Sequence, residues 1–283
     1  MNITANTRLL GILGDPVSHS LSPVMHNAAY QEMGLDLCYV PLHVSPDALA
    51  DAVSGIKAMR FMGANVTIPH KVPVVPLLDR LADSAVRTGA VNTLVNSDGM
   101  LVGHNTDGAG FIRSLEERIS IDYSASPVII AGAGGAARSV GVALADRGVP
   151  RITIINRSRQ RAQEFHDLLA AGFPQLEIFM MVPESDYGEL MRSSPLVINA
   201  TPLGMNERLK MVPLKVDAIS KYHVVCDLVY GRSQETPLLV AAREKGATIL
   251  GGLGMLLHQG AVAIRLWTGI EPPIEVMRRA IES

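Results

Sequence analysis

The sequence predicts an α/β protein of two domains, and three observations support this prediction. Short runs of aliphatic and β-branched residues alternate with amphipathic stretches along the whole chain, which is typical of α/β architecture. The length of 283 residues exceeds the usual size of one domain. The alternation also begins again after a stretch of small and polar residues at 120–127, "SIDYSASP". We therefore expect a domain boundary near or just before this stretch.

The first half of the chain predicts one α/β unit followed by a hairpin. Its expected strands lie at residues 8–13, 38–42 and 62–66. Its expected helices lie at about 23–34 and 46–60. Ser97, Asp98 and Gly99 stand between two further apolar runs, and such residues are typical of a hairpin turn. A helix from about Asp107 to Ile119 is expected to follow.

The second half predicts parallel strands joined by helices. The expected strands lie at 127–131, 151–155, 195–199 and 223–228, and the last two helices at about 253–267 and 273–282. Because these final helices are apolar, they need a surface to cover. We therefore expect the chain to return to the first domain at its end.

The composition indicates a globular protein that has neither nucleic acid nor a membrane as its partner. Hydrophobic residues make up 48% of the chain, and the formal net charge of −2 leaves no basic excess to neutralise a phosphate backbone. Cys38 and Cys226 lie in apolar runs without metal-ligand spacing, so we expect buried, reduced thiols and no metal site. A signal-peptide pattern and an apolar run of about 20 residues are both absent from the sequence. A cytoplasmic protein is expected.

A glycine motif predicts that the second domain binds a dinucleotide. Gly132, Gly134 and Ala137 match the pattern G-x-G-x-x-G/A directly after a predicted strand and at the start of a predicted helix. The first glycine permits a tight turn, the second lets the backbone approach a pyrophosphate, and the alanine allows close helix packing. Free N–H groups at the helix start would bind the phosphates. A turn that uses glycine for its geometry alone is the alternative. The motif favours a Rossmann-type domain.

The end of the next predicted strand favours NADP over NAD. An NAD site usually has an acidic residue there, which bonds the ribose 2′-hydroxyl group. Asn156, Arg157, Ser158 and Arg161 occupy this segment instead. Guanidinium groups hold phosphate oxygens in a bidentate fork, so two arginines and a hydroxyl group suit a 2′-phosphate. In the alternative, Arg157, Arg159 and Arg161 merely solvate the start of a helix.

Two serines precede the first predicted helix. Ser22 is expected as its N-cap and Pro23 as its first residue. The hydroxyl groups of Ser20 and Ser22, together with the free N–H groups of the helix start, would bind a small carboxylate. Ordinary capping by Ser22 is an equally good interpretation of this segment alone.

Further polar residues lie where strands of the first domain are expected to end. "NVTIPHK" ends with Asn65, Thr67 and Lys71 at the carboxyl edge of a predicted strand, where α/β proteins build their sites. Alone, Lys71 would be interpreted as a solvated surface lysine. Asn92 in "GAVNT" and Asp107 in "GHNTDG" change this interpretation. A lysine, a carboxylate and several amides suit a polyhydroxylated keto acid.

Taken in order, these segments resemble the shikimate dehydrogenase family over nearly the whole chain. No single segment would decide the matter, but the ordered set is highly specific. The matching segments are "GDPVSHSLSP", "NVTIPHK", "GAVNT", "GHNTDG", "GAGGAARS", "NRSRQR", "NATPLGM", "DLVY" and "GGLGMLLHQGA". The resemblance implies a substrate-binding, catalytic domain at 1–107 that is completed by 255–283, and an NADP-binding Rossmann domain at 108–254.

The resemblance also implies roles for individual residues. Lys71 and Asp107 would be the catalytic pair. The residues implied to surround the substrate are Ser20, Ser22, Asn65, Thr67, Asn92, Tyr230 and Gln259. Those implied to hold NADP(H) are Asp83, Gly132, Ala133, Gly134, Gly135, Ala136, Asn156, Arg157, Ser158, Arg161, Thr201, Pro202, Leu228 and Gly252. Asp83, Leu228 and Gly252 would lie near the nicotinamide end, and Thr201 and Pro202 would line the same region.

The implied activity is the reversible, NADPH-dependent reduction of 3-dehydroshikimate to shikimate in the chorismate pathway of aromatic amino acid biosynthesis. Quinate/shikimate dehydrogenases and paralogues that act on an aminated analogue share most of these residues, and a catalytically silent NADP-binding regulator is a further alternative. Family members occur as monomers and homodimers. Two departures from the family pattern are a longer segment after Tyr230, at 231–235, and His104 before "NTDG".

Overall fold

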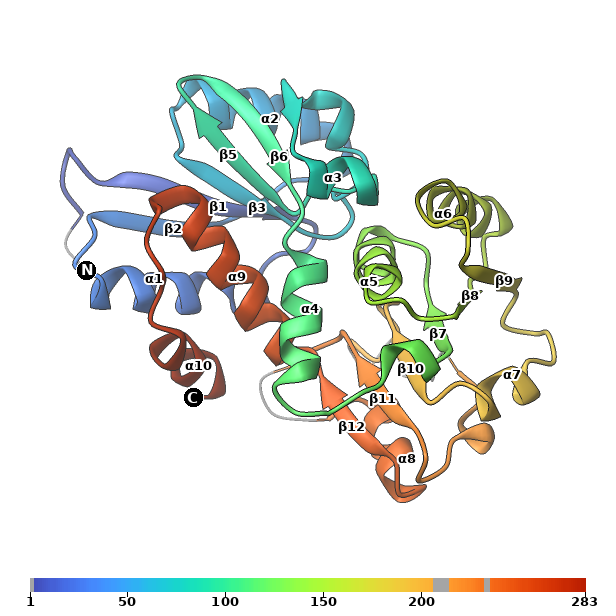
Figure 1. The fold of residues 1–283 in the computed structure, drawn as a ribbon. Helices are drawn as coiled ribbons and strands as arrows, with labels where there is room; N and C mark the ends of the chain where they lie inside the picture. The colour runs from blue at the N-terminus through green and yellow to red at the C-terminus, as the bar shows by residue number, and fades with distance from the viewer. Residues whose placement is uncertain (1–2, 206–213, 232–234) are drawn as a thin grey trace. The chain divides into compact units, whose positions relative to one another are not determined.

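The chain folds as two compact units (Figure 1). The computed structural model describes residues 3–205, 214–231 and 235–283. Unit 1 comprises Met1–Gly110 together with Leu256–Ser283, and unit 2 comprises Phe111–Met255. The division falls three residues after the first boundary expected from the sequence, 107/108, and one residue after the second, 254/255. Two helices, α4 (Asp107–Glu116) and α9 (Leu253–Thr268), run across these two points.

Unit 1 contains a mixed sheet with the strand order β2-β1-β3-β5-β6-β4. Its strands are β1 (Arg8–Gly14), β2 (Leu37–His43), β3 (Gly63–Val66), β4 (Arg80–Leu81), β5 (Thr93–Ser97) and β6 (Met100–His104). β1 pairs in parallel with β2 and β3, whereas β5 is antiparallel to both β3 and β6. The predicted hairpin is therefore present as β5 and β6, and Asp98 and Gly99 in its turn adopt positive φ angles.

Helices cover both faces of this sheet. Besides α9, unit 1 contains α1 (Ser22–Glu32), α2 (Leu49–Ala58), α3 (Asp83–Thr88) and α10 (Ile274–Glu282), which packs on α1, with short 3₁₀ turns at Pro46–Ala48 and Val75–Leu77. Val53 and Ile56 of α2 pack with sheet residues in one apolar cluster. Trp267 of α9 donates a hydrogen bond to Leu94 O at 2.8 Å. A Cβ atom at Gly63 would lie 2.3 Å from the Trp267 indole nitrogen, so α9 needs glycine there. α9 therefore packs on the sheet of unit 1.

Unit 2 contains a parallel sheet with the strand order β12-β11-β10-β7-β8-β9. Its strands are β7 (Val128–Ala131), β8 (Arg151–Ile155), β9 (Glu177–Met181), β10 (Leu196–Asn199), β11 (Val224–Asp227) and β12 (Thr248–Gly251). Numbered along the unit, this order is 3-2-1-4-5-6, the order of a Rossmann fold, in which ligands bind at the switch point between the first and fourth strands. The predicted α/β fold with a Rossmann-type second domain is confirmed.

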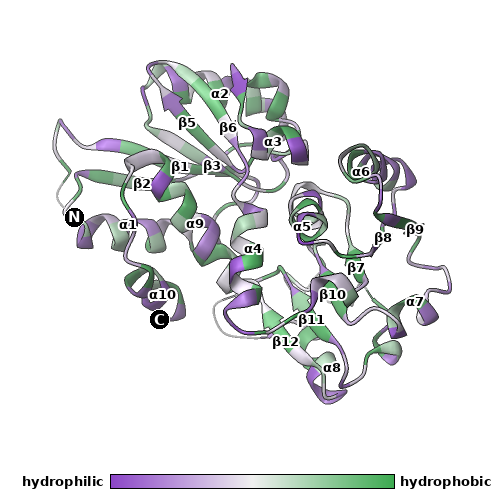
Figure 2. Cartoon of the chain, viewed as in Figure 1, coloured by the Kyte–Doolittle hydropathy of each residue, from purple (hydrophilic) through white to green (hydrophobic). Residues whose placement is uncertain are grey.

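The parallel strands of unit 2 are buried on both faces. Val128 and Ile130 belong to one apolar cluster, together with residues of α5 (Gly135–Asp146) and α6 (Arg159–Gly172). Ile129 and Ala131 belong to another, with residues of α7 (Gly188–Arg192) and α8 (Pro237–Glu244). Short 3₁₀ turns lie at Tyr123–Ala125 and Val216–Ala218. Figure 2 shows the central strands mostly in green, as expected for strands covered by helices on both sides.

The sequence does not predict the two edge strands of this sheet, β9 and β12. In β9, Phe179 and Met180 are exposed, and in β12 the residue Leu250 alone is buried. An edge strand pairs on one side only and is less covered, so its residues lack the continuous burial that marks a central strand. β9 and β12 form because they pair in register with β8 and β11, which is a long-range condition.

Within the described segments, no helix is long and apolar enough to cross a lipid bilayer. Both cysteines are buried free thiols.

His26 is a buried titratable group in the core of unit 1. Its ring stacks on Tyr39 with the centroids 4.2 Å apart, and Nδ1 lies 2.8 Å from Ser22 O, so this nitrogen donates its proton to the carbonyl group. The other ring nitrogen is buried without a partner among the described residues. Burial lowers the pKa of His26 to about 4, so the ring is neutral near pH 7.

His26 should make the protein less stable in mild acid. Its pKa is near 6.5 in the unfolded chain, so the unfolded state binds a proton below that pH while the folded state stays neutral down to about 4. We expect the free energy of unfolding to fall by roughly 2 kcal/mol from this group between pH 7 and pH 5. Urea unfolding at several pH values gives the slope of the free energy of unfolding against pH, and this slope should be smaller for His26→Asn than for wild type. His19→Asn, at an exposed histidine, is the control. Equal slopes for wild type and His26→Asn would contradict the expectation.

Candidate functional site

The strand directions of unit 1 bring its predicted site residues to one edge of the sheet. Because β5 is antiparallel to β3 and β6, those two strands end where β5 begins. β1 runs parallel to β3 and ends at the same edge. Lys71 follows β3, Asn92 precedes β5 and Asp107 follows β6. Segments that are far apart in the sequence therefore meet at this edge.

Lys71 and Asp107 form an ion pair. Lys71 Nζ lies 2.5 Å from Asp107 Oδ2, and the side chains are 15% and 4% exposed. The backbone holds the lysine in place, since Val91 N donates to Lys71 O at 2.7 Å. Asp107 is the first residue of α4, where a negative charge is stabilised by the helix dipole. The pair therefore combines a buried carboxylate with an ammonium group that solvent still reaches.

Asn92 links this pair to the rest of unit 1. Its Nδ2 lies 2.9 Å from Asp107 Oδ1, 2.9 Å from Thr106 Oγ1 and 3.1 Å from Gln259 Oε1. Its Oδ1 accepts a hydrogen bond from Thr106 N at 2.8 Å. An amide group has two hydrogens for these three acceptors, so one hydrogen is shared. Gln259 on α9 donates in turn to Leu256 O at 2.9 Å. α9 thus joins the hydrogen-bond network around Asp107.

Asn65 uses its amide group to hold strands together. Its Nδ2 donates to Asn92 O and Thr93 Oγ1, both at 3.0 Å, and its Oδ1 accepts from the Tyr39 hydroxyl at 2.7 Å. Both amide hydrogens are directed at protein acceptors. The geometry therefore indicates a supporting role at the base of the site for this residue.

The two serines lie at the start of α1 but do not cap it as predicted. The helix begins at Ser22, the preceding Leu21 already has a helical conformation, and no side chain caps the helix. The prediction that Ser22 is the N-cap is wrong, because Met25 N already donates to Leu21 O in the first helical turn. Ser20 Oγ instead accepts from Ser22 N at 3.2 Å. Ser22 is buried and Ser20 and Thr67 are half-buried.

In unit 2, the glycine turn after β7 leaves room for a dinucleotide. Gly132 has a φ of +113°, and a Cβ atom there would lie 3.0 Å from Ala200 O, so this turn requires glycine. Gly134 is exposed with open space where a side chain would stand. No side chain caps α5, which begins at Gly135, and its first turn has no acidic residue. Ala133 is buried and Ala136 half-buried. Open backbone N–H groups and close access fit a pyrophosphate.

The segment after β8 presents unpaired positive charge. Arg157 and Arg161 are exposed, and within the described part of the chain neither guanidinium group has an ion-pair partner. Asn156 Nδ2 donates to Ser158 O at 2.8 Å, and Ser158 Oγ accepts from Arg161 N at 3.4 Å, so Ser158 caps α6. The capping oxygen keeps its own proton to donate. Two unpaired arginines beside a serine hydroxyl fit a ribose 2′-phosphate.

Sequence reasoning missed a buried polar cluster at the ends of β10 and β11. Asn199 donates to Asp227 Oδ1 at 2.8 Å, and the Thr236 hydroxyl donates to Asp227 Oδ2 at 2.6 Å. All three side chains are buried. The signal was a polar residue at the end of each apolar strand, in "VIN" and "VVCD". Burial raises the pKa of the Asp227 carboxyl, while bonds from Thr236, Val229 and Asn199 act against this effect.

Other predicted residues are divided between the units. Tyr230 lies half-buried in unit 2, whereas the other predicted substrate residues lie in unit 1. Asp83 is exposed at the start of α3 in unit 1, whereas the other predicted cofactor residues lie in unit 2. Most of the longer segment after Tyr230, 232–234, lies outside the described residues.

The remaining residues predicted to bind the cofactor lie near the buried polar cluster. Thr201 and Leu228 are half-buried and Pro202 is exposed in the segments that follow β10 and β11. A Cβ atom at Gly252 would lie 2.5 Å from Leu228 O, so the backbone after β11 passes against this glycine.

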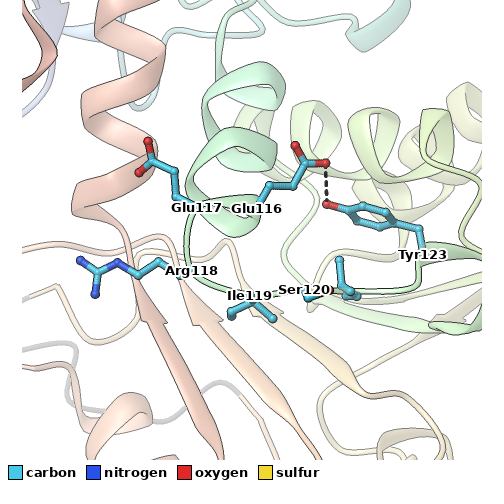
Figure 3. A pocket seen from close by; sticks show the side chains of 7 residues that line it. Glu116, Glu117, Arg118, Ile119, Ser120 and Tyr123 are labelled. Carbon is cyan, nitrogen blue, oxygen red and sulfur yellow. Dashed lines mark hydrogen bonds between the residues drawn. The ribbon is translucent and has the colours of Figure 1, made fainter.

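A surface hollow of about 480 Å³ lies at the end of α4 in unit 2 (Figure 3). It is lined by residues 116–121 and by Tyr123. Glu116 accepts a hydrogen bond from the Tyr123 hydroxyl at 3.3 Å and pairs with Arg147 at 2.9 Å. None of the predicted site residues lines this hollow. The described residues also contain no cluster of three or more His, Cys, Asp or Glu side chains that could hold a metal ion.

Comparison with known proteins identifies similar chains over the full length. Three family models match: "Shikimate dehydrogenase substrate binding domain" at residues 12–94, "Shikimate / quinate 5-dehydrogenase" at 114–204 and "Shikimate 5'-dehydrogenase C-terminal domain" at 252–282. A shikimate dehydrogenase (NADP(+)) of Moorella thermoacetica is 45% identical over 282 residues, which are 99% of this chain and 95% of the relative.

Solved structures give the same result. A shikimate dehydrogenase crystallised with NADP⁺ has a TM-score of 0.90 and 40% identity, covering 99% of this chain and 96% of that one. A quinate dehydrogenase from Corynebacterium glutamicum in complex with NAD has a TM-score of 0.85 and 33% identity, covering 97% and 98%. Full-length similarity at this level covers both units, the polar edge of unit 1 and the glycine turn of unit 2.

Proposed function

The chain belongs to the shikimate dehydrogenase family, and we propose that it catalyses the reversible, NADPH-dependent reduction of 3-dehydroshikimate to shikimate. The observation that carries this proposal is the Lys71–Asp107 pair, in which a buried carboxylate holds a partly exposed ammonium group. An inactive protein that kept only the fold would have no need to maintain a buried ion pair, since such pairs add little stability over apolar packing. The catalytically silent regulator is therefore the weaker alternative.

Lys71 acts on the substrate oxygen in this proposal. NADP(H) supplies hydride exchange between its nicotinamide C4 and the substrate carbonyl carbon. As that carbon is reduced, negative charge develops on the oxygen, and the Lys71 ammonium group stabilises it. A proton taken up by this oxygen, from Lys71 or from water, completes the hydroxyl group of shikimate. Asp107 orients the lysine through the 2.5 Å contact and is itself held by Asn92. The charge is thus in position before the reaction and needs little reorganisation.

The carboxylate and hydroxyl groups of the substrate would be bound by the neighbouring polar residues. Ser20, Ser22 and Thr67 supply hydroxyl groups for the carboxylate. Asn92 and Gln259 take the ring hydroxyl groups, with Asn65 as their support. Tyr230 is proposed as a further substrate contact from unit 2.

The proposed NADP site follows from three features of unit 2. The uncapped glycine turn at 132–136 holds the pyrophosphate, and Asn156, Arg157, Ser158 and Arg161 hold the 2′-phosphate. Thr201, Pro202, Leu228 and Gly252 line the nicotinamide end, to which Asp83 contributes from unit 1. The unpaired state of the two arginines supports NADP over NAD, because no protein carboxylate among the described residues competes for them.

We also propose that the protein works in the cytoplasm as a monomer or homodimer, without nucleic acid or membrane as a partner. Its two buried free thiols and the low net charge of −2 support this proposal.

Steady-state kinetics with shikimate and quinate, each with NADP⁺ and NAD⁺, tests the proposed function. The similarity to a quinate dehydrogenase makes quinate the second candidate substrate. We expect kcat/KM to be highest for shikimate with NADP⁺, by about ten-fold or more over the other three pairs. Absence of turnover with NADP⁺ and shikimate would overturn the proposal, and a preference for quinate would favour the second candidate.

Lys71→Ala should remove most of the activity and little of the substrate binding. If the ammonium group acts mainly in the transition state, kcat falls by a factor on the order of 10² or more, while KM for shikimate changes far less. Lys57→Ala is the matched control, because Lys57 also pairs with an aspartate in unit 1, at 2.9 Å from Asp79, but lies on the surface. Activity of Lys71→Ala within a few-fold of wild type would rule out this role.

Arg157→Ala should discriminate between the two cofactors. NADP⁺ differs from NAD⁺ by one phosphate group, so a residue that contacts only this group affects one cofactor. We expect kcat/KM for NADP⁺ to fall by about 10- to 100-fold, the value of one charge-assisted contact, and that for NAD⁺ to stay nearly constant. Arg159→Ala, at an exposed arginine on the first turn of α6, is the control and should change the ratio less. An equal loss for both cofactors would mean that Arg157 supports the adenine site or the fold.

A further inference from the structure

Two buried polar side chains meet where the central strands of unit 2 end. Asn199 and Asp227 are the last residues of β10 and β11 and pair with each other in the sheet register. Asn199 is 0% exposed and Asp227 is 1% exposed, and the amide Nδ2 donates to Asp227 Oδ1 at 2.8 Å. The mechanism proposed above gives neither residue a role.

The asparagine organises the segment after β10. Its Oδ1 accepts hydrogen bonds from Thr201 N at 2.9 Å and from the Thr201 hydroxyl at 2.7 Å. Its Nδ2 also donates to Leu203 O at 3.2 Å. One side chain therefore fixes both the backbone and the hydroxyl group of Thr201.

The aspartate organises the segments after β11. Its Oδ1 also accepts from Val229 N at 3.1 Å, and its Oδ2 accepts from the Thr236 hydroxyl at 2.6 Å. The oxygen of Thr236 accepts in turn from Leu239 N at 3.4 Å and caps α8. Asp227 thus connects the segment that carries Leu228 to the start of α8 and, through Asn199, to the segment that carries Thr201.

The segment after β10 lies beside the glycine turn at 132–136, and the segment after β11 lies beside Gly252. Gly132 packs against Ala200 O, and Gly252 packs against Leu228 O. Residues 201, 202 and 228 are those proposed for the nicotinamide end of the cofactor. The arginines proposed for the 2′-phosphate follow β8, which is separated from β10 by β7 in the sheet. The buried polar cluster is therefore next to one half of the cofactor site only.

We propose that Asp227 is a positioning residue for hydride transfer: its carboxylate fixes the segments after β10 and β11 at the nicotinamide end of the site. This inference rests on the proposed function. Burying a carboxylate costs free energy that an apolar residue of the same size would not. Its three donors, Asn199, Val229 and Thr236, satisfy the carboxylate at this place. The fixed segments keep the nicotinamide at a reactive distance and orientation.

The test is Asp227→Asn, which keeps the shape and replaces one acceptor oxygen with a donor. Facing Val229 N and Asn199 Nδ2, that donor meets two other donors. Facing Thr236, it makes the hydroxyl group an acceptor and leaves the hydroxyl proton without the carboxylate. Both arrangements disturb the bonds that fix the segments. We expect the hydride-transfer rate in a single turnover of shikimate and NADP⁺ to fall about ten-fold or more. The Kd of 2′,5′-ADP, which carries the adenine half and the 2′-phosphate alone, should stay within about two-fold of wild type.

A matched pair at Thr236 keeps the proposal testable if Asp227→Asn fails to fold. Thr236→Ser retains the hydroxyl group that donates to Asp227 and caps α8, whereas Thr236→Ala removes it. We expect the serine variant to transfer hydride at nearly the wild-type rate and the alanine variant to transfer it more slowly. Leu169→Ala, in the apolar cluster on the other side of the sheet, controls for a general loss of stability.

The outcomes separate this inference from the proposed function. Three outcomes would each overturn the positioning role. They are a hydride-transfer rate of Asp227→Asn within two-fold of wild type, a Kd of 2′,5′-ADP that rises by the same factor as the hydride-transfer rate falls, and equal hydride-transfer rates for the two Thr236 variants. If wild type does not turn over shikimate with NADP⁺, the proposed function fails. The positioning role is then judged by the Kd values of Asp227→Asn and wild type. Weaker binding of NADP⁺ by the variant with unchanged binding of 2′,5′-ADP supports the role, and the same change for both ligands overturns it.

Discussion

The contact between Lys71 and Asp107 is the interaction on which the arrangement of unit 1 depends. A carboxylate that is 4% exposed needs partners for both oxygens, and Lys71 and Asn92 supply them. Asn92 reaches the carboxylate because it immediately precedes β5. Since β5 is antiparallel to β3 and β6, its start lies at the edge where those two strands end. The glutamine of α9 completes the network. The C-terminal segment thus serves the charge at the site as well as the core.

The proposed binding sites of the two units use different chemical groups. Unit 1 uses side chains, and its polar groups are joined in a chain from Tyr39 through Asn65 and Asn92 to Asp107. Unit 2 uses backbone at the glycine turn, where an uncapped helix start and an absent side chain leave access for phosphates. Charge enters unit 2 through two exposed arginines. The polar side chains around Asp107 in unit 1 are therefore buried and fixed, while Gly134 in the glycine turn and the two arginines of unit 2 are open to solvent.

Each unit contains a buried polar group that lowers its stability and fixes the position of neighbouring segments. His26 remains neutral in the core because burial lowers its pKa to about 4, which makes the fold sensitive to mild acid. Its Nδ1 donates to Ser22 O within the first turns of α1, and its ring stacks on Tyr39 of β2. Asp227 in unit 2 carries a similar cost of burial and connects three segments. His26 is hydrogen-bonded to Ser22, and Asp227 is linked through Asn199 to Thr201, so each polar group is connected to a residue proposed to bind a ligand.

The sequence by itself determined the α/β fold, the Rossmann-type domain and the glycine turn, because these depend on local patterns: hydrophobic periodicity and glycines at fixed spacing. It also identified Lys71, Asn92 and Asp107 as candidates, and the full-length similarity confirmed the family. Only the tertiary structure decided which of them touch. Asn92 and Gln259 are 167 residues apart, and the edge strands and the Asn199–Asp227 pair likewise depend on register between distant segments. Local patterns cannot specify such register, because it is set by strand order and by packing of the whole unit.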